Sequence, residues 1–597
     1  MGLMQQALET YRYAEKKYAG VYFAEADEPL APVGHTITKA KIEITINKDG
    51  LFLEANKVDE DDEKTIYSVT EESVGRTSGA ARKRPHPLCD KLQYYIPSNT
   101  VEYECYIKQL EEWTNSEYSH PILSPLLKYI KRGTILEDLK MADLLKIDDK
   151  GNIKNEGDFV RWIVNGIDEN SGPCWKCRSL QESYINWYRS LNSENMVFCM
   201  ISGEKSYSAK QHAKGIVSLN GNAKLISTND NEGFSYRGRF LDASEALTVG
   251  YDTSQKAHNA LRWVIANQGV YFGGRLFVGW NPQGKKLPKV TGIMARRNNV
   301  SASYTPTAYR EQLRNTLNSW KKEYPEDARA VTAVFDAATK GRLAVVYYSE
   351  FQATDFVDRL AYWDETCCWP SMNFGIQSPV LSDVVDYAFG TLRSNGYETD
   401  DNIKKNIMLQ LVMSRIERAA IPVTIERALV QRAGNLQVIP DDKEHKFLRN
   451  KFLFATCAVI RKYHIDHFKE DFEMGLEAEK HDRSYQFGRW MAIMEKIERD
   501  TYDIDDKREP NIIRRQHAFT IRPYATAVSV MEHLKMAYYP QLSVYQRSFY
   551  EKKIEQIMDI LSDQMDMLNN ALGDSYLMGY YLQKKELYTS NKEKEEE

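Results

Sequence analysis

The side chains in this sequence that could hold a metal ion or move protons are a few cysteines and histidines. Cys174 and Cys177 have the two-residue gap that allows both thiolates to bind one metal ion. A tetrahedral zinc site needs about four such ligands, and no second pair with this spacing follows in the chain. We therefore expect both residues to be reduced cysteines, and we predict neither a metal nor a cofactor.

Four histidines are the candidates for nuclease chemistry, which needs carboxylates or histidines that converge on a metal ion. One of them, His481, is followed directly by Asp482. His464 and His467 share one face of a predicted helix, and His86 lies in a basic segment. None of them belongs to a longer metal-binding motif, and the sequence has no GxxxxGK(S/T) phosphate loop. We expect that the chain is not an enzyme. A nuclease whose metal ligands are dispersed along the sequence remains an alternative.

Length and composition indicate a multidomain globular protein. The 597 residues exceed what one hydrophobic core usually organises, and 42% hydrophobic with 27% charged residues is ordinary for a soluble fold. No apolar run is long enough to span a membrane, and Met1 to Gly20 lack the apolar stretch of a secretory signal. We expect a cytoplasmic protein. Because the net charge is −5, residues that bind nucleic acid would have to be clustered.

Alternation of apolar and polar residues predicts strands in the first part of the chain. Lys41–Ile46 and Leu51–Leu53 alternate on either side of Asp49 and Gly50, which is typical of a hairpin with a tight turn. A second hairpin is predicted at Val331–Phe335 and Arg342–Tyr348, and a further strand at Leu276–Trp280.

Beyond residue 383 apolar residues recur at intervals of three and four, which is typical of helices. Pro523 suits the first turn of a helix, because its missing N–H costs little there. The predicted fold is α+β, with a mixed α/β region at residues 1–382 and a helical bundle at residues 383–597. The predicted core faces of two helices are Phe487, Trp490, Met491, Met494 and Ile497, and Ile554, Ile557, Met558, Leu561, Met565, Leu568 and Leu572.

A loop-like segment from Gly75 to Lys91 concentrates positive charge. Its glycines allow the backbone to approach a nucleic-acid groove, and its cations can contact phosphates or base edges. A surface loop whose charges only solvate it is the alternative. The candidate DNA-binding residues of this segment are Arg76, Ser78, Gly79, Arg82, Lys83 and Arg84.

Two further groups of polar and basic residues could bind nucleic acid. One lies in a segment rich in Ser, Gly and Asn that could follow a sugar–phosphate backbone, although a structural strand–loop region is equally consistent with it. The other lies on predicted helices, where Arg489 could instead brace the bundle through an internal ion pair. The first group comprises Lys205, Lys214, Asn222, Lys224 and Arg237, and the second comprises Arg483, Arg489, Arg514, Arg515 and Arg522.

Four blocks of residues, spread in order over nearly the whole chain, are similar to those of a known family. They are an Arg-Thr-Ser-Gly and Pro-Leu-x-Asp pattern in Gly75–Leu92, a Cys-x-x-x-Gly-Glu to Phe-Ser-Tyr stretch in Cys199–Tyr236, a Gly-Arg-Leu strand in Lys340–Tyr348, and a Tyr-x-x-Gly-Arg helix in Ser484–Ile497, followed by LMGYYLQ at Leu577–Gln583. In these blocks the sequence resembles the large-subunit family of the type I-C CRISPR Cascade.

The resemblance implies a DNA-binding subunit that leaves catalysis to other proteins. In such complexes the guide RNA reads the target by base pairing, while protein recognises a short flanking motif in duplex DNA. The large subunit is then expected to recognise this protospacer-adjacent motif and to aid R-loop formation. The implied partners are CRISPR RNA, target DNA, the backbone and guide-processing Cascade subunits, and a helicase-nuclease recruited in trans.

The resemblance also implies that the C-terminal helical region is made separately as a small subunit, from an internal start codon. Met474 is the candidate start, because it precedes the Tyr485–Arg489 motif and would release residues 474–597 as one unit. A scaffold that binds only proteins is a further alternative, which the pI of about 6.2 and the 37 tyrosines favour.

Overall fold

The chain divides into two compact units in a computed structural model. The first comprises Met1–Val270, Arg275–Leu287 and Arg329–Glu350, and the second comprises Tyr271–Gly274, Pro288–Ala328 and Phe351–Glu597. No helix in the described part of the chain is both long and apolar enough to cross a bilayer. The structure describes residues 1–18, 29–76, 83–167, 172–192, 196–219, 221–227, 240, 247–290, 292, 305–339, 341–372, 375–440, 447–503 and 508–588.

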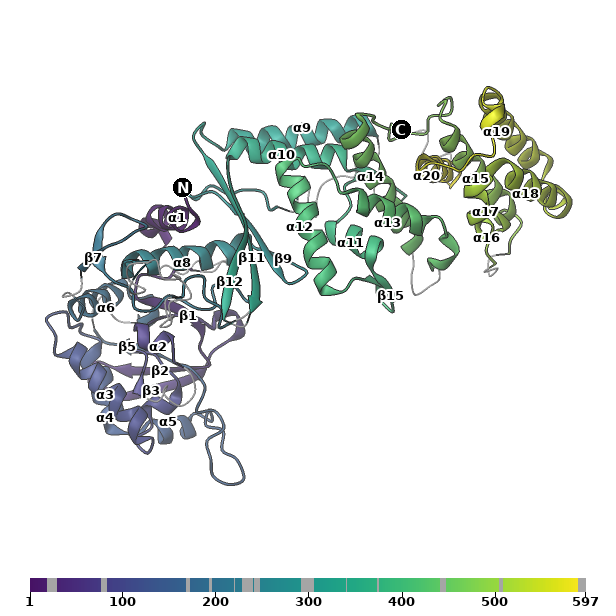
Figure 1. Ribbon diagram of the computed structural model, residues 1–597. Coiled ribbons are helices and arrows are strands. Elements are labelled where there is room, and N and C mark those ends of the chain that lie inside the picture. Colours follow the sequence, from purple (N-terminus) through teal and green to yellow (C-terminus); the bar gives the residue numbers. More distant parts are fainter. Residues whose placement is uncertain are drawn as a thin grey trace. The chain divides into compact units, whose positions relative to one another are not determined.

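Short strands and helices alternate along the first unit (Figure 1). Its helices are α1 (Leu3–Tyr18), α2 (Glu71–Val74), α3 (Thr100–Thr114), α4 (Leu123–Arg132), α5 (Ile135–Met141), α6 (Arg178–Ser190) and α8 (Tyr251–Gln268), with 3₁₀ helices at Glu60–Asp62, Leu92–Tyr95 and Cys174–Lys176. Its strands are β1 (His35–Lys39), β2 (Ile42–Asn47), β3 (Phe52–Lys57), β4 (Lys64–Ser68), β5 (Val160–Asn165), β6 (Gly172–Pro173), β7 (Met196–Phe198), β8 (Lys205–Tyr207), β10 (Arg275–Trp280) and β11 (Arg329–Thr339); β9 (Val270–Phe272) and β12 (Arg342–Gln352) contain residues of both units.

One sheet of the first unit has the strand order β3-β2-β5-β6. The hairpin β2–β3 turns at Gly50, whose φ of 73° favours glycine, and a Cβ there would lie only 2.5 Å from the carbonyl oxygen of Pro125. Strand β5 pairs in parallel with β2, and α4 and α5 pack beside β2 and β3 (Figure 1). Buried aromatic rings such as Trp113, Tyr95 and Trp162 fill the core. The predicted first hairpin is confirmed.

A second sheet of the first unit contains β12, β11 and β10 in that order. Helices α1 and α8 pack together, and their apolar faces share a buried core with β10 and β11, in which Tyr11, Leu261 and Phe335 are almost fully buried. The indole N–H of Trp280 donates to Thr10 Oγ1 at 3.0 Å, which ties β10 to α1. The second predicted hairpin and the predicted strand at Leu276–Trp280 are confirmed.

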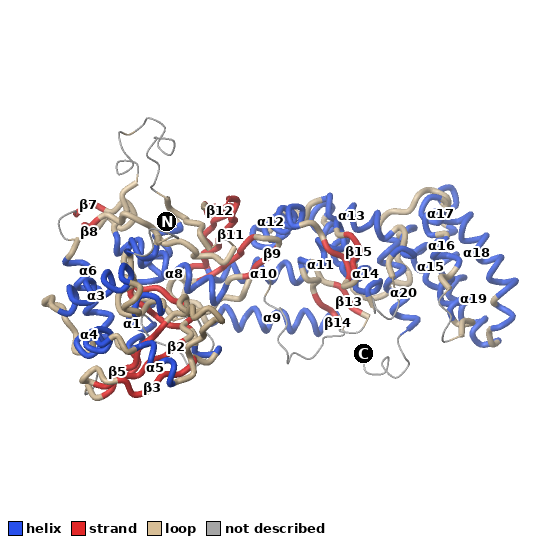
Figure 2. The backbone as a smooth tube through the Cα atoms, turned by 90° about the horizontal axis from the view of Figure 1, so that it is seen from below, coloured by secondary structure: helices blue, strands red, loops and turns tan. Residues whose placement is uncertain are grey.

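The second unit is mainly helical in its described residues, as the blue segments from α9 to α20 in Figure 2 show, with short strands such as β13, β14 and β15 in red. Its helices are α9 (Pro306–Lys322), α10 (Ala353–Thr366), α11 (Leu381–Phe389), α12 (Asp401–Glu417), α13 (Val423–Ala433), α14 (Leu448–Phe468), α15 (Arg483–Arg499), α16 (Asn511–Arg514), α17 (Gln516–Ile521), α18 (Pro523–Ala537), α19 (Val544–Ser562) and α20 (Ser575–Tyr588). Its strands are β13 (Trp369–Ser371), β14 (Gly375–Gln377), β15 (Thr391–Arg393) and β16 (Gly396–Glu398), and 3₁₀ helices lie at Leu436–Val438, Tyr539–Gln541 and Met565–Met567.

Helices α15 and α20 approach each other backbone to backbone. A Cβ built on Gly488 of α15 would lie 1.9 Å from the carbonyl oxygen of Tyr576, and one on Gly579 of α20 would lie 2.1 Å from the carbonyl oxygen of Tyr485. Each glycine therefore makes room for the other helix. The Tyr-x-x-Gly-Arg and LMGYYLQ patterns of the sequence are the two sides of this contact.

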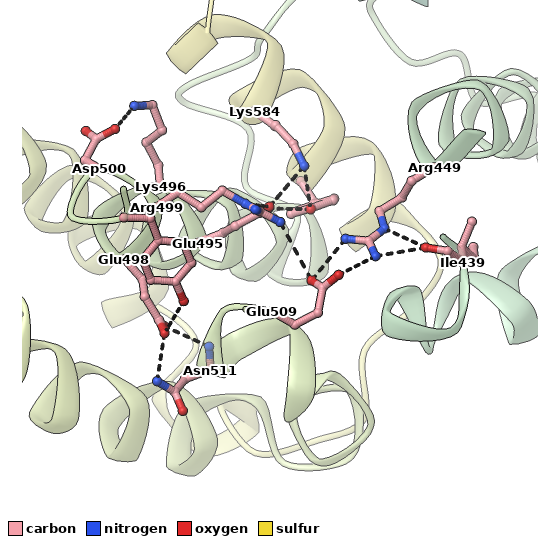
Figure 3. A network of polar contacts seen from close by, with 12 residues as sticks. Ile439, Arg449, Glu495, Lys496, Glu498, Arg499, Asp500, Glu509, Asn511 and Lys584 are labelled. Atoms are coloured by element: carbon pink, nitrogen blue, oxygen red, sulfur yellow. Dashed lines mark hydrogen bonds and ion pairs between the residues drawn. The ribbon is translucent and has the colours of Figure 1, made fainter. Parts of the chain in front are cut away.

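A partly buried network of charges joins α14, α15 and α20 (Figure 3). Arg449 and Glu509 form an ion pair at 2.6 Å, and Arg499 lies 3.7 Å from the same carboxylate. Glu495 accepts hydrogen bonds from Arg499 at 2.7 Å and from Lys584 at 3.1 Å. Burial opposes the ionisation of Glu495, but the cations of Lys584 and Arg499 outweigh it and lower its pKa to about 2.

The predicted α+β class is confirmed: a mixed N-terminal region precedes the helical C-terminal region. Pro523 begins α18 as expected, and the predicted core face of α15 is buried throughout. The division at residues 382 and 383 stays a prediction. The short hairpin β15–β16 lies beyond it, and its strands of three residues each were too short to show an alternating pattern.

The predicted continuous helix face from Ile554 to Leu572 is wrong. Helix α19 ends at Ser562, and Met565 is 64% exposed. The backbone beyond α19 bonds to other segments instead of extending the helix. Arg483 donates to the carbonyl oxygens of Asn570 and Ala571, and the N–H of Leu572 donates to the carbonyl oxygen of Thr520.

Candidate nucleic-acid interface

Arg76, the first cation after α2, turns inward. Its guanidinium donates to both carboxylate oxygens of Asp90, at 2.8 Å and 2.5 Å, and its side chain is only 11% exposed. It also donates to the carbonyl oxygen of Arg84 at 3.0 Å and lies 4.9 Å from the centroid of the Tyr94 ring. Burial raises the pKa of Asp90, and the Arg76 guanidinium opposes that shift. These contacts favour a role for Arg76 in holding the loop.

Lys83 and Arg84 are exposed where the described chain resumes after this loop. Neither forms an ion pair with another described residue. The contact from Arg76 to the carbonyl oxygen of Arg84 fixes the backbone here. Their side chains are therefore available to phosphates or base edges.

Helix α2 and Gly75, which follows it, lie against a segment that is remote in sequence. The carboxylate of Glu71 accepts hydrogen bonds from the backbone N–H groups of Lys210 at 2.8 Å and Gln211 at 3.0 Å. Gly75 lies so close to Gln211 that a Cβ on it would be 2.3 Å from the side-chain oxygen. The basic segment with Arg76 and the basic segment with Lys214, which the sequence presents as separate groups, are thus next to each other in the first unit.

The backbone brings Lys214 and Lys224 next to each other. They form a backbone bridge, closed by a hydrogen bond of 3.0 Å from the N–H of Gly215 to the carbonyl oxygen of Ala223. Lys224 also bridges to Arg342 on β12. Burial lowers the pKa of Lys224, and the neighbouring charge of Lys214 lowers it further. An anion placed here would relieve this repulsion.

The positive potential extends from Lys214 back to the loop. His86 is buried, and its Nδ1 lies 2.8 Å from Ser73 Oγ. Burial lowers the pKa of His86, and the charges of Arg76, Lys91 and Lys214 lower it further. All three cations therefore act on one buried imidazole. The neutral imidazole supports the loop without adding to its charge.

Arg262 on α8 was missed by the sequence analysis. Its guanidinium donates to the carbonyl oxygen of Lys214 at 2.7 Å and to Thr36 Oγ1 at 3.0 Å, and it forms no ion pair with a described carboxylate. Burial lowers its pKa. A single arginine on a helix carries no sequence signal of this contact. We call Lys91, Lys214, Lys224 and Arg262 the basic cluster.

A comparison with protein-family models matches residues 12–588 to a family described as CRISPR-associated protein (Cas_Csd1). The chain belongs to this family. The Cas_Csd1 match contains the loop after α2, the basic cluster and the helices α15–α20. A search of curated proteins found no match.

Two of the predicted arginines in the helical region of this Cas_Csd1 protein are held by the fold. Arg489 is 1% exposed and donates to the side chain of Gln583 at 3.0 Å and to the carbonyl oxygen of Ala478 at 2.6 Å. Arg483 donates to the carbonyl oxygens described above. The internal bracing considered for Arg489 is present, with amide and carbonyl acceptors in place of a carboxylate.

The other predicted arginines of the helical region, Arg514, Arg515 and Arg522, are exposed. Arg515 donates to Ser529 Oγ at 3.2 Å, and Arg514 donates to Asn511 Oδ1 at 2.7 Å. None of the three forms an ion pair with another described residue. They remain candidates for contacts with a nucleic-acid backbone.

The remaining predicted residues fall into two groups. Lys205 and Asn222 are exposed in the first unit. Ser78, Gly79, Arg82 and Arg237 lie outside the described residues.

The candidate metal ligands have other roles in the fold. His464 lies between Asp574 at 2.9 Å and Glu470 at 3.2 Å, and His467 Nε2 contacts the carbonyl oxygen of Ile421 at 2.9 Å. Cys174 is buried, and burial raises the pKa of its thiol. In the described part of the chain, no group of three or more His, Cys, Asp or Glu residues is placed to hold a metal ion.

Proposed function

We propose that this protein is the large subunit of a type I-C Cascade, which recognises the protospacer-adjacent motif in duplex DNA and aids R-loop formation. Membership of the Cas_Csd1 family supports the assignment to a CRISPR effector complex. The observation that carries the DNA-binding role is the contact of α2 and Gly75 with Lys210 and Gln211, which lead into the segment with Lys214 and Lys224. The resulting cluster has a local positive charge in a chain of net charge −5.

The proposed division of labour follows from exposure and charge. Lys83 and Arg84 are exposed and can reach base edges, while Lys214 and Lys224 suit the phosphates of the same duplex. Catalysis is left to a helicase-nuclease recruited in trans, and the protein itself is not an enzyme. Its further partners are CRISPR RNA and the backbone and guide-processing subunits.

Removing the paired lysines should weaken DNA binding mainly through electrostatics. We expect Lys214→Ala with Lys224→Ala to reduce the affinity of the guide-loaded complex for all target duplexes, and to flatten the slope of log K against log salt by about one for each phosphate that is no longer neutralised. Filter binding at several salt concentrations measures both. Lys57→Ala, an exposed lysine on β3, is the matched control. An unchanged slope in the double variant would contradict the assignment.

Lys83→Ala and Arg84→Ala test whether this part of the loop recognises the flanking motif. If these side chains bind base edges, discrimination between flanking sequences should fall by about 1–3 kcal/mol for each side chain removed, on duplexes that differ only in these bases. A uniform loss of affinity would instead show that both residues only bind phosphates.

We also propose that residues 474–597 form the complex's small subunit, translated from Met474. In support of this, α15 packs against α18, α19 and α20 within that range. Met474 itself is buried, and leucine has a similar volume. We expect mass spectrometry of the purified complex to detect a polypeptide that begins at Met474, and a Met474→Leu codon change to remove it while the full chain persists. Absence of the fragment from the unmodified complex would refute this proposal.

A further inference from the structure

The hairpin β7–β8 presents large apolar side chains to solvent. Phe198 is 67% exposed, Met196 is 53% exposed, and the neighbouring Met200 is 56% exposed. Met196 and Phe198 are two residues apart on one strand, so their side chains leave the same face of the hairpin. Exposed apolar residues that gather in this way usually mark a binding surface.

The hairpin is anchored to α1 and α8. Tyr207 of β8 stacks on Tyr251 of α8, with 4.8 Å between ring centroids and an interplanar angle of 21°. The N–H of Ala209 donates to the carbonyl oxygen of Val249 at 2.9 Å. Arg12 of α1 pairs at 2.6 Å with Glu204, which follows β7. The exposed ring therefore extends from a well-anchored support, which reduces the entropy cost of binding.

A cation accompanies the exposed ring. Phe198 lies opposite Lys205 in the strand register, and the ammonium nitrogen of Lys205 is 5.3 Å from the ring centroid. Strand β8 then leads directly into the segment with Lys210 and Lys214. An aromatic ring, an adjacent cation and a basic segment that follows them form the combination by which proteins bind single-stranded nucleic acid.

We infer that Phe198 is a stacking site for an unpaired base of DNA, with Lys205 next to the adjoining phosphate. This inference rests on the proposed DNA-binding function and assigns one contact within it. A planar ring beside a cation suits an unpaired base together with its phosphate. Met196 and Met200 extend the apolar border of the ring.

The test compares the full-length chain on two single-stranded oligonucleotides, one with normal bases and one with an abasic run of the same length. Both carry the same phosphates, so the ratio of their affinities isolates the base contribution. The unmodified chain should prefer the normal strand by roughly 5- to 150-fold. Phe198→Ala should remove most of that preference and leave affinity for the abasic strand unchanged.

Three further variants make the result specific. Phe198→Trp should retain the preference, because it keeps a planar ring, whereas Phe198→Leu should lose it although it keeps apolar area. Leu53→Ala, which removes another exposed apolar side chain of the first unit, should match the unmodified chain.

The experiment separates a failure of the proposed function from a failure of the stacking site. If the unmodified chain shows no salt-dependent binding to either strand or to target duplex in the guide-loaded complex, the proposed function fails and this inference with it. If binding is present but Phe198→Ala or Phe198→Leu keeps the base preference, the stacking site alone is overturned. Loss of co-purifying Cascade subunits with unchanged DNA binding would overturn it in favour of a protein contact.

Discussion

Gly488→Ala and Gly579→Ala should each destabilise the helical region by about 2 kcal/mol or more. Alanine favours a helix by about 1 kcal/mol over glycine, but overpacking a close contact costs about 1–3 kcal/mol and sometimes more. Here the added methyl group would meet a backbone oxygen at 1.9 Å or 2.1 Å, and a backbone cannot rotate away as a side chain can. The helices α15 and α20 must separate to make room for the methyl group. We therefore expect a cost in the upper part of the range of about 1–3 kcal/mol for overpacking, or above it.

Hydrogen exchange at the amides of α15 and α20 measures this effect, because it reports the local stability of each helix. The double variant should lose less stability than the sum of the two single losses, since one separation of the helices relieves both clashes. Gly475→Ala is the control, because its Cβ would meet nothing within 4 Å. Unchanged protection in both single variants would mean that the helices do not pack as described.

Arg76→Ala should destabilise the first unit by about 3–5 kcal/mol, because it leaves the buried carboxylate of Asp90 without its cation. The carboxylate of Asp90 keeps hydrogen bonds from the backbone N–H groups of His86 and Lys91. Thermal unfolding, with hydrogen exchange of the first unit as the readout, measures this loss of stability. Arg84→Ala, which removes an exposed side chain from the same loop, should change stability by less than about 0.5 kcal/mol.

The pH dependence of this defect has a defined sign. Burial raises the pKa of Asp90, and the Arg76 guanidinium opposes that shift. Without the guanidinium, folded Asp90 takes up a proton more readily than unfolded Asp90, so the stability of Arg76→Ala should fall as pH rises. If Arg76→Ala instead keeps its stability and loses only DNA binding, Arg76 contacts DNA directly, as its place in the basic segment first indicates.

Local features of the fold could be predicted from the sequence. The turn at Gly50 and the helix start at Pro523 depend on residues within a few positions, and both are as expected. The break after Ser562 could not be predicted, because the apolar spacing continues through it. Contacts from remote residues, such as that of Arg483 with Asn570, determine where the chain turns.

The sequence could predict which basic residues belong to the candidate site, but not how the fold arranges them. Sequence identifies Arg76 and Lys214 equally well as cations, yet only the fold shows that the first is paired with Asp90 and the second lies beside Lys224. The contact of Glu71 with Lys210 joins residues 139 positions apart. No pattern in either segment indicates this meeting.

Glu509 is shared by Arg449, which precedes Met474 in the chain, and Arg499, which follows it (Figure 3). A polypeptide that begins at Met474 would lack the first partner and keep the second. Gln516, which donates to the carbonyl oxygen of Ala433, and Asp574, which pairs with His464, would likewise turn toward water. Several of the side chains that join the two parts in the full chain are thus ones that can bind water where a partner is missing.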